Sequence, residues 1–313
     1  MVTEETNIRS VDNAVNVSAP TEDRNPASVH IDTLPTLEVL RLLNAEDATV
    51  PTAVSAVLPD LARLVDDAVT RIRAGGTVHY FGAGTSGRLA VLDAAELRPT
   101  FNSPAGLFTA HHAGGAEALL AAVENVEDDE EAGRQEAQVL GHLDVAIGLT
   151  ASGRTPFVRG ALGVARERGS LTALVTAHSE SEIGALADHV ISPATGPEVV
   201  TGSTRLKAGS AQKLVLNGFS TSVMIALGRT WSNLMVDVVA TNAKLRGRVV
   251  RILREATGVD EESAQRALAE AGGELKPALL NLLTGVPAAE ARSLLDTHGG
   301  SVAAALHAIA PTG

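Results

Sequence analysis

The sequence predicts an α/β fold, in which a parallel sheet flanked by helices is preceded by N-terminal helices and followed by a small C-terminal helical bundle. Between residues 77 and 192, short apolar runs typical of buried strands alternate with helical patterns. Strands separated by helices indicate a parallel sheet covered on both faces. After residue 202 the pattern is helical. Aromatic residues make up only 2% of the chain, which suits a core of aliphatic side chains.

The N-terminal part contains a tail and two expected helices. Residues 1–17 are polar and weakly periodic, and we expect them to be disordered. The segment 21–31, TEDRNPASVHI, is too polar for a core and unusually specific for a tail. Apolar residues at helical spacing predict a helix over 36–48. A second helix is expected over 52–73, where a Gly-Gly pair follows it.

Short apolar runs mark the strands of the expected sheet. They lie at 77–81, 106–110, 144–150, 171–177 and 190–192. Helical patterns lie between them at 116–126, 156–168 and 182–187. In such sheets the ligand sits at the carboxyl ends of the strands, near the point where the strand order reverses. The turns that follow the strands are therefore the places to search for functional residues.

Helical patterns continue toward the C-terminus. A long, largely apolar helix is expected over 204–227, and helical character continues over 231–254. Beyond Gly258, several short helical segments indicate a small bundle without a chemical motif. The expected division of the chain is a disordered tail at 1–20, an N-terminal helical segment at 21–76, the sheet domain at 77–257 and the bundle at 258–313.

Charge and composition narrow the class of protein. The formal net charge is -12 and no basic face is evident, so a nucleic acid is not an expected partner. The chain has no cysteine, which excludes disulfides and thiolate metal sites. We find no secretion signal and no apolar run long enough to span a bilayer, and we therefore expect a cytoplasmic protein without a membrane partner.

The stretch TVHYFGAGTSGRLAVLDAAELRPT, residues 77–100, carries the first candidate site. Its apolar run leads into a glycine-rich turn, and a helical pattern follows directly. A strand, a glycine turn and a helix in this order aim free backbone N–H groups and a helix dipole at an anion. A phosphate is the expected ligand, with Thr85, Ser86 and Gly87 as its candidate contacts.

The glycines of this turn also match the dinucleotide spacing GxGxxG, but the supporting context is poor. The next expected strand ends in His111 and His112 rather than in the acidic residue that holds a ribose. No GK[ST] follows the turn, so it is not a P-loop. The two histidines lack a third ligand at metal spacing. We therefore expect neither a metal nor a cofactor.

A second turn strengthens the case for phosphate. The expected strand 144–150 leads into ASGRT and then into a proline at a helix start. Ser152, Gly153 and Thr155 are the candidate contacts in this turn. Two hydroxyl-and-glycine turns that converge on one ligand supply many donors with little positive charge. This arrangement suits a sugar phosphate better than a nucleoside triphosphate.

The longer motifs resemble a known family. The paired turns look like the sugar isomerase (SIS) domain, which binds phosphosugars. The segments FGAGTSGRLAVLDAAELRPTF, ASGRTPFV, TGSTRLKAGSAQKLVLN and NLMVDVVATNAKLRGR resemble the N-acetylmuramic acid 6-phosphate etherases, and TEDRN fits the start of that family. At Ala95, Leu97 and Arg98 the chain departs from the usual family pattern, which leaves the fine substrate contacts there open.

The resemblance implies a reaction. The family cleaves the lactyl ether of N-acetylmuramic acid 6-phosphate with water, by elimination and then hydration, and releases N-acetylglucosamine 6-phosphate and D-lactate. A base removes the C2 proton, which the C1 aldehyde of the open-chain sugar acidifies. An acid protonates the ether oxygen as lactate leaves from C3. Two carboxyl groups with separated pKa values suffice for this chemistry.

Glu96 and Glu127 match the positions that the family uses for catalysis. The resemblance makes Glu96 the proton donor to the leaving oxygen and Glu127 the other acid/base group. Glu96 continues the helical stripe of Leu89 and Leu92, so we expect it to be partly buried. Glu127 begins an acidic run that otherwise reads as a solvated face. The nearest competing carboxylates are Asp93 and Glu124.

The segment TGSTRLKAG, at the start of the long helix, is expected to form a further ligand loop. Ser203, Thr204 and Lys207 are its candidate contacts, either to the phosphate or to the lactyl carboxylate. Arg88 and Arg154 are alternatives for holding that carboxylate.

One distance favours a homodimer. Ser86 and Glu96 are ten residues apart on one expected helix, roughly 15 Å, which a hexose phosphate does not bridge comfortably. We therefore expect two subunits that share their active sites. Two other functions stay open: a phosphosugar-sensing regulator like the glucokinase regulatory protein, and an aldose–ketose isomerase. Release of lactate distinguishes the lyase from both.

Overall fold

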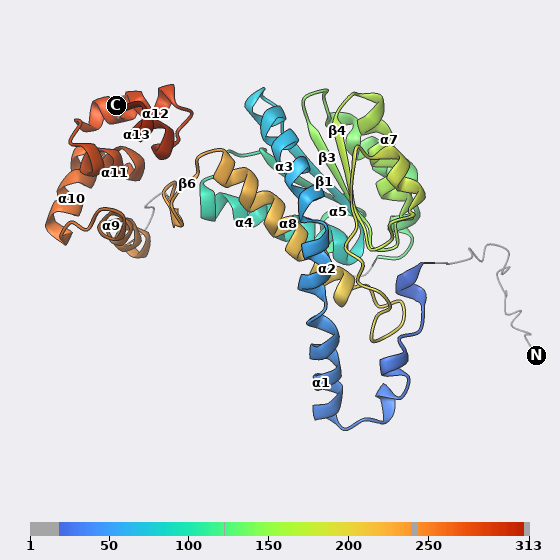
Figure 1. Cartoon of the computed structure of the whole chain (residues 1–313). Coiled ribbons are helices and arrows are strands. Elements are labelled where there is room, and N and C mark those ends of the chain that lie inside the picture. Colours follow the sequence, from blue (N-terminus) through green and yellow to red (C-terminus); the bar gives the residue numbers. More distant parts are fainter. Residues whose placement is uncertain (1–18, 122, 239–242, 310–313) are drawn as a thin grey trace, which may run out of the picture.

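A five-stranded parallel sheet lies at the centre of the fold, with the strand order β2-β1-β3-β4-β5 (Figure 1). The computed structural model describes residues 19–121, 123–238 and 243–309. The predicted α/β class is confirmed. The strands are β1 Val78–Gly82, β2 Phe108–His112, β3 Val145–Leu149, β4 Leu171–Val175 and β5 His189–Ile191.

The strand order reverses between β1 and β3. β1 pairs in parallel with both β2 and β3, and its last residue, Gly82, is in register with His112 and with Leu149. The chain therefore leaves β1 toward one edge of the sheet and returns on the other side of β1 to form β3. In doubly wound sheets, ligands bind at the carboxyl ends of the strands on either side of such a reversal.

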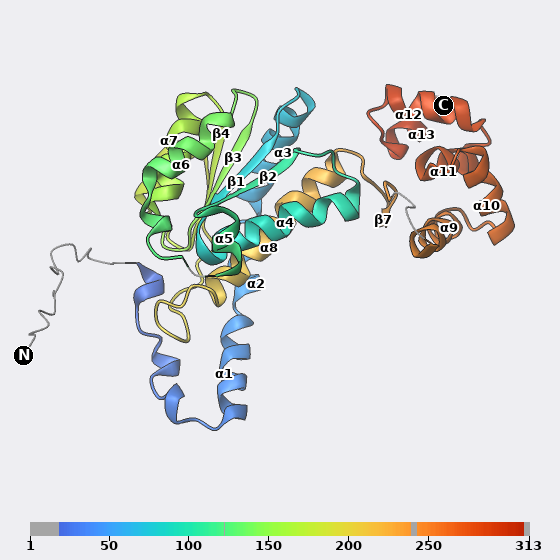
Figure 2. The same cartoon turned by 180° about the vertical axis from the view of Figure 1, so that it is seen from behind.

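Helices cover both faces of the sheet (Figures 1 and 2). Side chains alternate along β1, so Tyr80 belongs to the core of one face and Phe81 to the core of the other. On the Tyr80 face lie α3 Leu58–Arg73, α4 Gly84–Phe101 and α8 Lys207–Ala226. On the Phe81 face lie α6 Glu130–Glu136 and α7 Pro156–Glu167.

The helix expected over 52–73 is divided into two. α2 covers Val50–Ala56 and α3 begins at Leu58. The reason is Pro59, which has no N–H to donate and whose ring clashes with the carbonyl group four residues earlier.

The helix expected over 116–126 is shorter than predicted. α5 covers only Gly115–Leu120, and Asn125 adopts the left-handed conformation with φ 65°. Isolated left-handed residues do not continue a right-handed helix. Short 3-10 helices follow at η4 Val126–Asp128, η5 Ala137–Val139 and η6 Glu182–Leu186.

The prediction of helical character over 231–254 is wrong over 231–238, and its part at 239–242 lies outside the described residues. β6 Thr230–Trp231 and β7 Leu234–Met235 form an antiparallel hairpin. Its turn contains Ser232 with φ 50°, a positive value of the kind that tight two-residue hairpin turns require. α9 Ala243–Thr257 follows the hairpin.

The C-terminal helices enclose a second hydrophobic core and form a separate cluster in Figure 1. Val249, Ile252 and Leu253 of α9 belong to this core, so α9 packs with the helices that follow it. The division at 257/258 stays a prediction. The remaining helices are α10 Glu261–Glu270, α11 Leu275–Thr284, α12 Ala288–Thr297 and α13 Val302–Ile309.

The N-terminal segment forms an arm that projects from the sheet domain (Figure 1). Its helix α1 Thr36–Asp47 is fully described, and none of its residues is buried. The predicted tail at 1–20 lies outside the described residues except for Ala19, which is buried, and Pro20. The arm begins with η1 Pro20–Glu22, η2 Pro26–Ser28 and η3 Ile31–Thr33.

No single helix of the described chain is both long and apolar enough to cross a membrane. One bent pair, Thr36–Ala56 with Leu58–Arg73, meets the length and composition limits only when its two parts, 57° apart, are taken together.

Candidate functional site

The turn between β1 and α4 is close-packed. A Cβ atom on Gly87 would lie 2.5 Å from the Gly82 carbonyl oxygen, and one on Gly82 would lie 2.9 Å from the Gly87 nitrogen. Gly84 has φ +53°, a value that glycine adopts without strain. These glycines let α4 begin directly above the end of β1. The N-cap residue, Ala83, makes no side-chain capping bond, and the first N–H groups of an α-helix have no partner within the helix.

The turn between β3 and α7 lies beside the first one, because β1 and β3 are neighbouring strands that end in register. Its hydroxyl groups bond to one another: the Thr150 and Thr155 Oγ1 atoms are 2.8 Å apart, and the Arg154 N–H donates to Ser152 Oγ. Gly153 has φ +72° and packs against Ser181. The sheet thus places the two predicted hydroxyl-and-glycine turns at neighbouring strand ends.

Ser86, in the first turn of α4, contacts α8. Its side chain is 8% exposed, and its Oγ donates a hydrogen bond to Gln212 Oε1 over 2.9 Å. Thr85, the residue before it, lines a groove of about 420 Å³ together with Leu89 and two exposed cationic side chains, Arg205 and Lys213. The exposed carboxylate of Asp47 lines the same groove, which therefore combines hydroxyl, cationic and acidic groups close to the turn.

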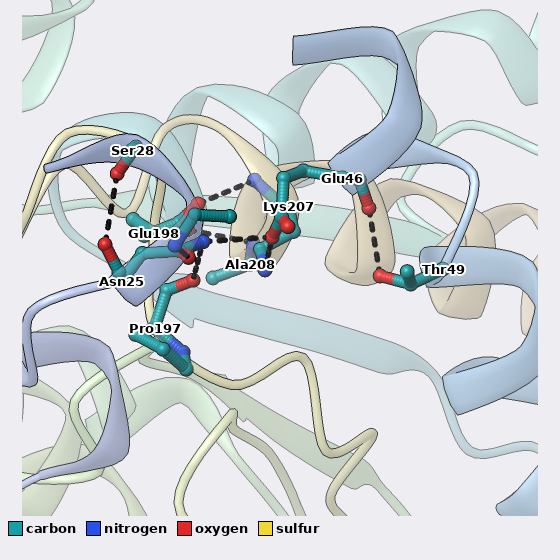
Figure 3. Close-up of polar contacts among 9 residues, drawn as sticks. Asn25, Ser28, Glu46, Thr49, Pro197, Glu198, Lys207 and Ala208 are labelled. Atoms are coloured by element: carbon teal, nitrogen blue, oxygen red, sulfur yellow. Dashed lines mark hydrogen bonds and ion pairs between the residues drawn. The ribbon is translucent and has the colours of Figure 1, made fainter. Parts of the chain in front are cut away.

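The start of α8 is already paired with a carboxylate from its own chain. Glu198 is fully buried, and its two oxygens accept hydrogen bonds of 3.0 Å from the backbone N–H groups of Lys207 and Ala208 (Figure 3). A carboxylate at a helix N-terminus satisfies free N–H groups and opposes the positive end of the dipole. The α8 terminus thus offers fewer donors to an external anion than the α4 terminus does.

Lys207, a predicted ligand contact, is held inside the protein. Its side chain is 4% exposed, and its Nζ lies 2.6 Å from Glu46 Oε2 at the end of α1 (Figure 3). The hydrogen bond from Lys207 keeps the pKa of Glu46 below its usual value. The same Glu46 oxygen accepts a 2.8 Å hydrogen bond from Asn25 of the TEDRN segment. This network joins the N-terminal arm to the start of α8.

The loop before α8 carries the other two predicted contacts, Ser203 and Thr204, both partly buried. The TEDRN segment lies against this loop, since the Gly202 N–H donates to the Thr21 carbonyl oxygen over 3.1 Å. A Cβ atom on Gly202 would lie 2.9 Å from a Glu22 oxygen. The unexplained polarity of the segment thus reflects its contacts with the α8 loop.

Glu127 lies close to the first turn of α4. It lines a cavity of about 390 Å³ together with Gly84, Arg88, His112 and Glu124. Arg88, predicted as a possible carboxylate ligand, is engaged at the end of α5: its guanidinium donates to the carbonyl oxygens of residues 118, 119 and 121. The predicted catalytic residue Glu127 and its competitor Glu124 therefore line the same cavity as Gly84 of the candidate phosphate turn.

The expectation that Glu96 is partly buried is wrong for the single chain. Glu96 is exposed and Leu92 is 50% exposed, whereas Leu89 packs against the core, so the stripe leaves the core surface before it reaches Glu96. The buried carboxylate of α4 is Asp93, which is 8% exposed. Glu96 also lies twelve residues beyond Gly84 along α4, roughly 18 Å, and does not line the cavity of Glu127.

Asp93 connects three elements. Its Oδ2 accepts a hydrogen bond of 3.0 Å from the Tyr80 hydroxyl of β1, and its Oδ1 accepts one of 3.0 Å from the Ser220 hydroxyl of α8. Burial raises the pKa of Asp93 to about 6, although the two hydrogen bonds act in the opposite direction. Asp93 does not line any of the cavities described above, and its geometry is that of a structural contact between α4, β1 and α8.

Sequence reasoning missed Gln212 and Glu198. Gln212 lies at helical spacing with Ala208, Ala211 and Val215, all of them buried, so a polar residue on that apolar face was a usable signal. Glu198 lies in the loop nine residues before α8, where no helical pattern marks it as buried. Within the described residues no group of three or more histidine, cysteine, aspartate or glutamate side chains is arranged to hold a metal ion.

The parallel sheet and its two hydroxyl-and-glycine turns define the class as SIS domains. Residues 60–166 match the family model of the glucokinase regulatory protein N-terminal SIS domain. A phosphoheptose isomerase from Francisella tularensis has a similar fold, with a TM-score of 0.50, 16% identity, and coverage of 61% of this chain and 100% of that one.

Two curated relatives identify the family. The N-acetylmuramic acid 6-phosphate etherase of Thermobifida fusca is 60% identical over 268 residues, 86% of this chain and 88% of the relative. The protein of the same name from Pectobacterium atrosepticum is 50% identical over 287 residues, 91% of this chain and 95% of the relative. At this identity and coverage, the chain belongs to the N-acetylmuramic acid 6-phosphate etherases.

Proposed function

We propose that this protein cleaves the D-lactyl ether of N-acetylmuramic acid 6-phosphate with water and releases N-acetylglucosamine 6-phosphate and D-lactate. The observation that carries the proposal is its 60% identity, over 86% of the chain, to an etherase of that name. The first turn of α4 supports it, because the backbone N–H groups at a helix N-terminus bind phosphate. We place the reaction in the recycling of cell-wall amino sugars in the cytoplasm.

The phosphate site of the proposal lies between β1 and β3. The adjacent turns and the α8 loop approach the same edge of the sheet, where the small apolar residues Ala151, Ala177 and Ala208 pack together. Lys207 enters the proposal as an anchor of the α8 loop, because Glu46 holds its ammonium group. The proposed contacts are Thr85, Ser86, Gly87, Ser152, Gly153, Thr155, Ser203 and Thr204.

The proton transfers are assigned to Glu96 and Glu127. The reaction needs a base for the C2 proton and an acid for the ether oxygen at C3, and two carboxyl groups in different environments provide them. Glu127 lines the cavity at the α4 turn. Glu96 lies outside that cavity, so in this proposal it acts in the active site of a second subunit.

A homodimer is therefore part of the proposal. The outer surface of α4 and α8 carries exposed apolar side chains, among them Leu92 and Ile225, which are 50% and 53% exposed. The stripe that holds Glu96 is on this surface. A second copy packed there would cover the apolar side chains and bring Glu96 of one subunit toward the other. Such isologous contacts are the commonest way in which identical subunits associate.

Two cations are placed to receive the lactyl carboxylate. Arg205 and Lys213 are exposed and line the same groove as Thr85. A carboxylate in this groove would lie near Thr85 of the phosphate turn. Arg88, the earlier alternative, is already committed to the carbonyl groups at the end of α5.

The function is tested by incubating the purified protein with N-acetylmuramic acid 6-phosphate. We expect equal amounts of D-lactate and N-acetylglucosamine 6-phosphate, measured by coupled enzymatic assay and by mass spectrometry. N-acetylmuramic acid without the phosphate is the matched control and should release far less lactate, because the α4 turn then has no anion to bind. Binding of the phosphosugar without lactate release would favour a sensor, and formation of a ketose phosphate would favour an isomerase.

A further inference from the structure

The side-chain amide of Gln212 lies against the first turn of α4. Gln212 is 3% exposed, and its Oε1 accepts the hydrogen bond that Ser86 Oγ donates over 2.9 Å. Ser86 is itself 8% exposed. The contact joins residues 126 positions apart, so it exists only because α8 packs along α4. The position of the amide is thus set by two packed helices rather than by a mobile loop.

The other half of this amide has no partner among the described residues. Gln212 Nε2 is buried and unbonded. Buried polar groups in proteins are nearly always hydrogen-bonded, and an exception calls for an explanation. Turning the amide by 180° does not help, because Oε1 would then be the unbonded atom. With the Ser86 hydroxyl donating to Oε1, the unbonded group is the amide N–H₂, which only donates, so its missing partner is an acceptor.

The surroundings of the amide indicate an anionic acceptor. The first turn of α4 carries free N–H groups and the positive end of a helix dipole, and no described side chain caps it. The neighbouring helix α8 differs, because Glu198 already accepts from its first N–H groups. Gln212 Nε2 is a buried, unbonded donor, and the hydrogen bond from Ser86 holds its amide against the first turn of α4.

We propose that Gln212 is a ligand-contacting residue, whose Nε2 donates a hydrogen bond to a phosphate oxygen of the phosphosugar while its Oε1 holds the Ser86 hydroxyl group. The inference rests on the proposed function and extends it from the turn residues to α8. A contact to the phosphate is made equally in the bound substrate and in the transition state. Its loss therefore raises KM and leaves kcat nearly unchanged.

Two substitutions test the assignment. Gln212→Glu keeps the size of the side chain but places acceptors, and at neutral pH a negative charge, where the donor was. Gln212→Met keeps the approximate volume and removes the donor without adding charge. Gln135→Glu, on the exposed side of α6, is the matched control. Binding of N-acetylglucosamine 6-phosphate and of inorganic phosphate is measured by calorimetry, and the melting temperature of each variant without ligand reports on its fold.

We expect affinity for both probes to fall about 100-fold or more in Gln212→Glu and about 10-fold in Gln212→Met, the size of a lost hydrogen bond to a charged group. Gln135→Glu should bind like the unmodified protein. If Gln212→Glu does not fold, the affinities measured for Gln212→Met test the proposal by themselves. Undiminished binding by the folded variants would overturn the proposal and leave a buried water as the partner of Nε2.

Two further results would also overturn it, for different reasons. Weaker binding of the sugar phosphate with unchanged binding of inorganic phosphate would assign the contact to a sugar oxygen instead. Failure of the unmodified protein to bind any phosphosugar would refute the proposed function itself, and the assignment of Gln212 with it.

Discussion

Glu96 lies on the outer side of α4, whereas Asp93, three residues earlier, is buried beneath the same helix. A general acid must hold its proton until the leaving group needs it, and a carboxyl group does so near neutral pH only when it is shielded from water. Within the described part of the chain, Glu96 is exposed to solvent. Its proposed role therefore requires that another surface, from the substrate or from a second subunit, closes over α4.

Replacing either glutamate should abolish most turnover without abolishing binding. We expect Glu96→Gln and Glu127→Gln each to lower kcat for D-lactate release by roughly 10²- to 10⁴-fold, the usual contribution of a general acid or base. The amide keeps the shape of the side chain but transfers no proton. Calorimetry with N-acetylglucosamine 6-phosphate should give a Kd within about threefold of the unmodified value, because ground-state contacts remain.

The controls for this prediction come from neighbouring carboxylates. Glu131→Gln changes an exposed residue of α6 and should leave kcat unchanged. Glu124 lines the same cavity as Glu127 and is its closest competitor. If Glu124→Gln eliminates turnover while Glu127→Gln does not, the second acid/base role belongs to Glu124.

Among the secondary-structure elements, α4, β1 and α8 are joined by hydrogen bonds to one buried side chain, that of Asp93. The Tyr80 hydroxyl of β1 and the Ser220 hydroxyl of α8 both donate to this carboxylate of α4. α4 carries the phosphate turn at one end and Glu96 further along. The Asp93 contact thus helps to determine how both candidate groups are placed relative to the sheet.

The raised pKa of Asp93 makes stability depend on pH in a definite direction. Its pKa is about 6 in the folded protein against the ordinary 3.8 of an aspartate side chain in water, so the folded state binds the proton more tightly. Stability is therefore lost as the pH rises through this interval, by about 3 kcal/mol at most. Asp93→Asn does not titrate and should gain that amount relative to the unmodified protein between pH 4 and pH 7 in urea unfolding.

The comparison must be made as a difference between variants, because other groups titrate in the same interval. Asp66→Asn, on the exposed side of α3, is the control and should follow the unmodified protein across the range. Asp93→Ala should instead be destabilised at every pH, because it leaves two buried hydroxyl groups without their acceptor. A constant difference between Asp93→Asn and the unmodified protein would show that burial does not raise the pKa of Asp93.

The sheet could be predicted well because buried parallel strands are continuous apolar runs. The run 144–150 contains β3, and 77–81 differs from β1 by one residue at each end. The expected second strand, 106–110, lies two residues before β2, because two consecutive histidines are not typical of a buried strand. Within β2, His111 Nδ1 lies 2.8 Å from Glu136, and His112 Nδ1 lies 2.7 Å from the Ala113 carbonyl oxygen, so both polar rings are satisfied inside the strand.

The sequence predicted only those parts of the candidate site whose residues are close together along the chain. The β1–α4 turn could be predicted from the sequence, since several closely spaced glycines between an apolar run and a helical pattern indicate a tight turn. The Ser86–Gln212 and Glu46–Lys207 contacts join residues 126 and 161 positions apart, and no periodic pattern encodes such pairs. The direction of the Glu96 stripe was misjudged because helical spacing shows that side chains share a face, not whether that face is covered by the same chain.

For the whole molecule, the uncovered apolar surfaces are the main argument for association. In the N-terminal arm, Leu37 and Leu40 of α1 are 56% and 57% exposed, and Leu92 on α4 is 50% exposed. Leu37 and Leu40 lie three residues apart on α1 and so form one exposed apolar face, and such faces often mark a protein–protein contact. A second copy of the chain would cover them and would also supply the Glu96 that the cavity of Glu127 lacks.

Shared active sites predict that two inactive variants restore each other. We expect a heterodimer of Glu96→Gln and Glu127→Gln, co-expressed with different tags, to regain about half of the unmodified activity, because one of its two sites then receives both intact glutamates and the other neither. Glu96→Gln carrying both tags is the control and should stay inactive. If instead each site were built within one chain, every site of the heterodimer would lack one glutamate, and release of D-lactate would remain at the level of the separate variants.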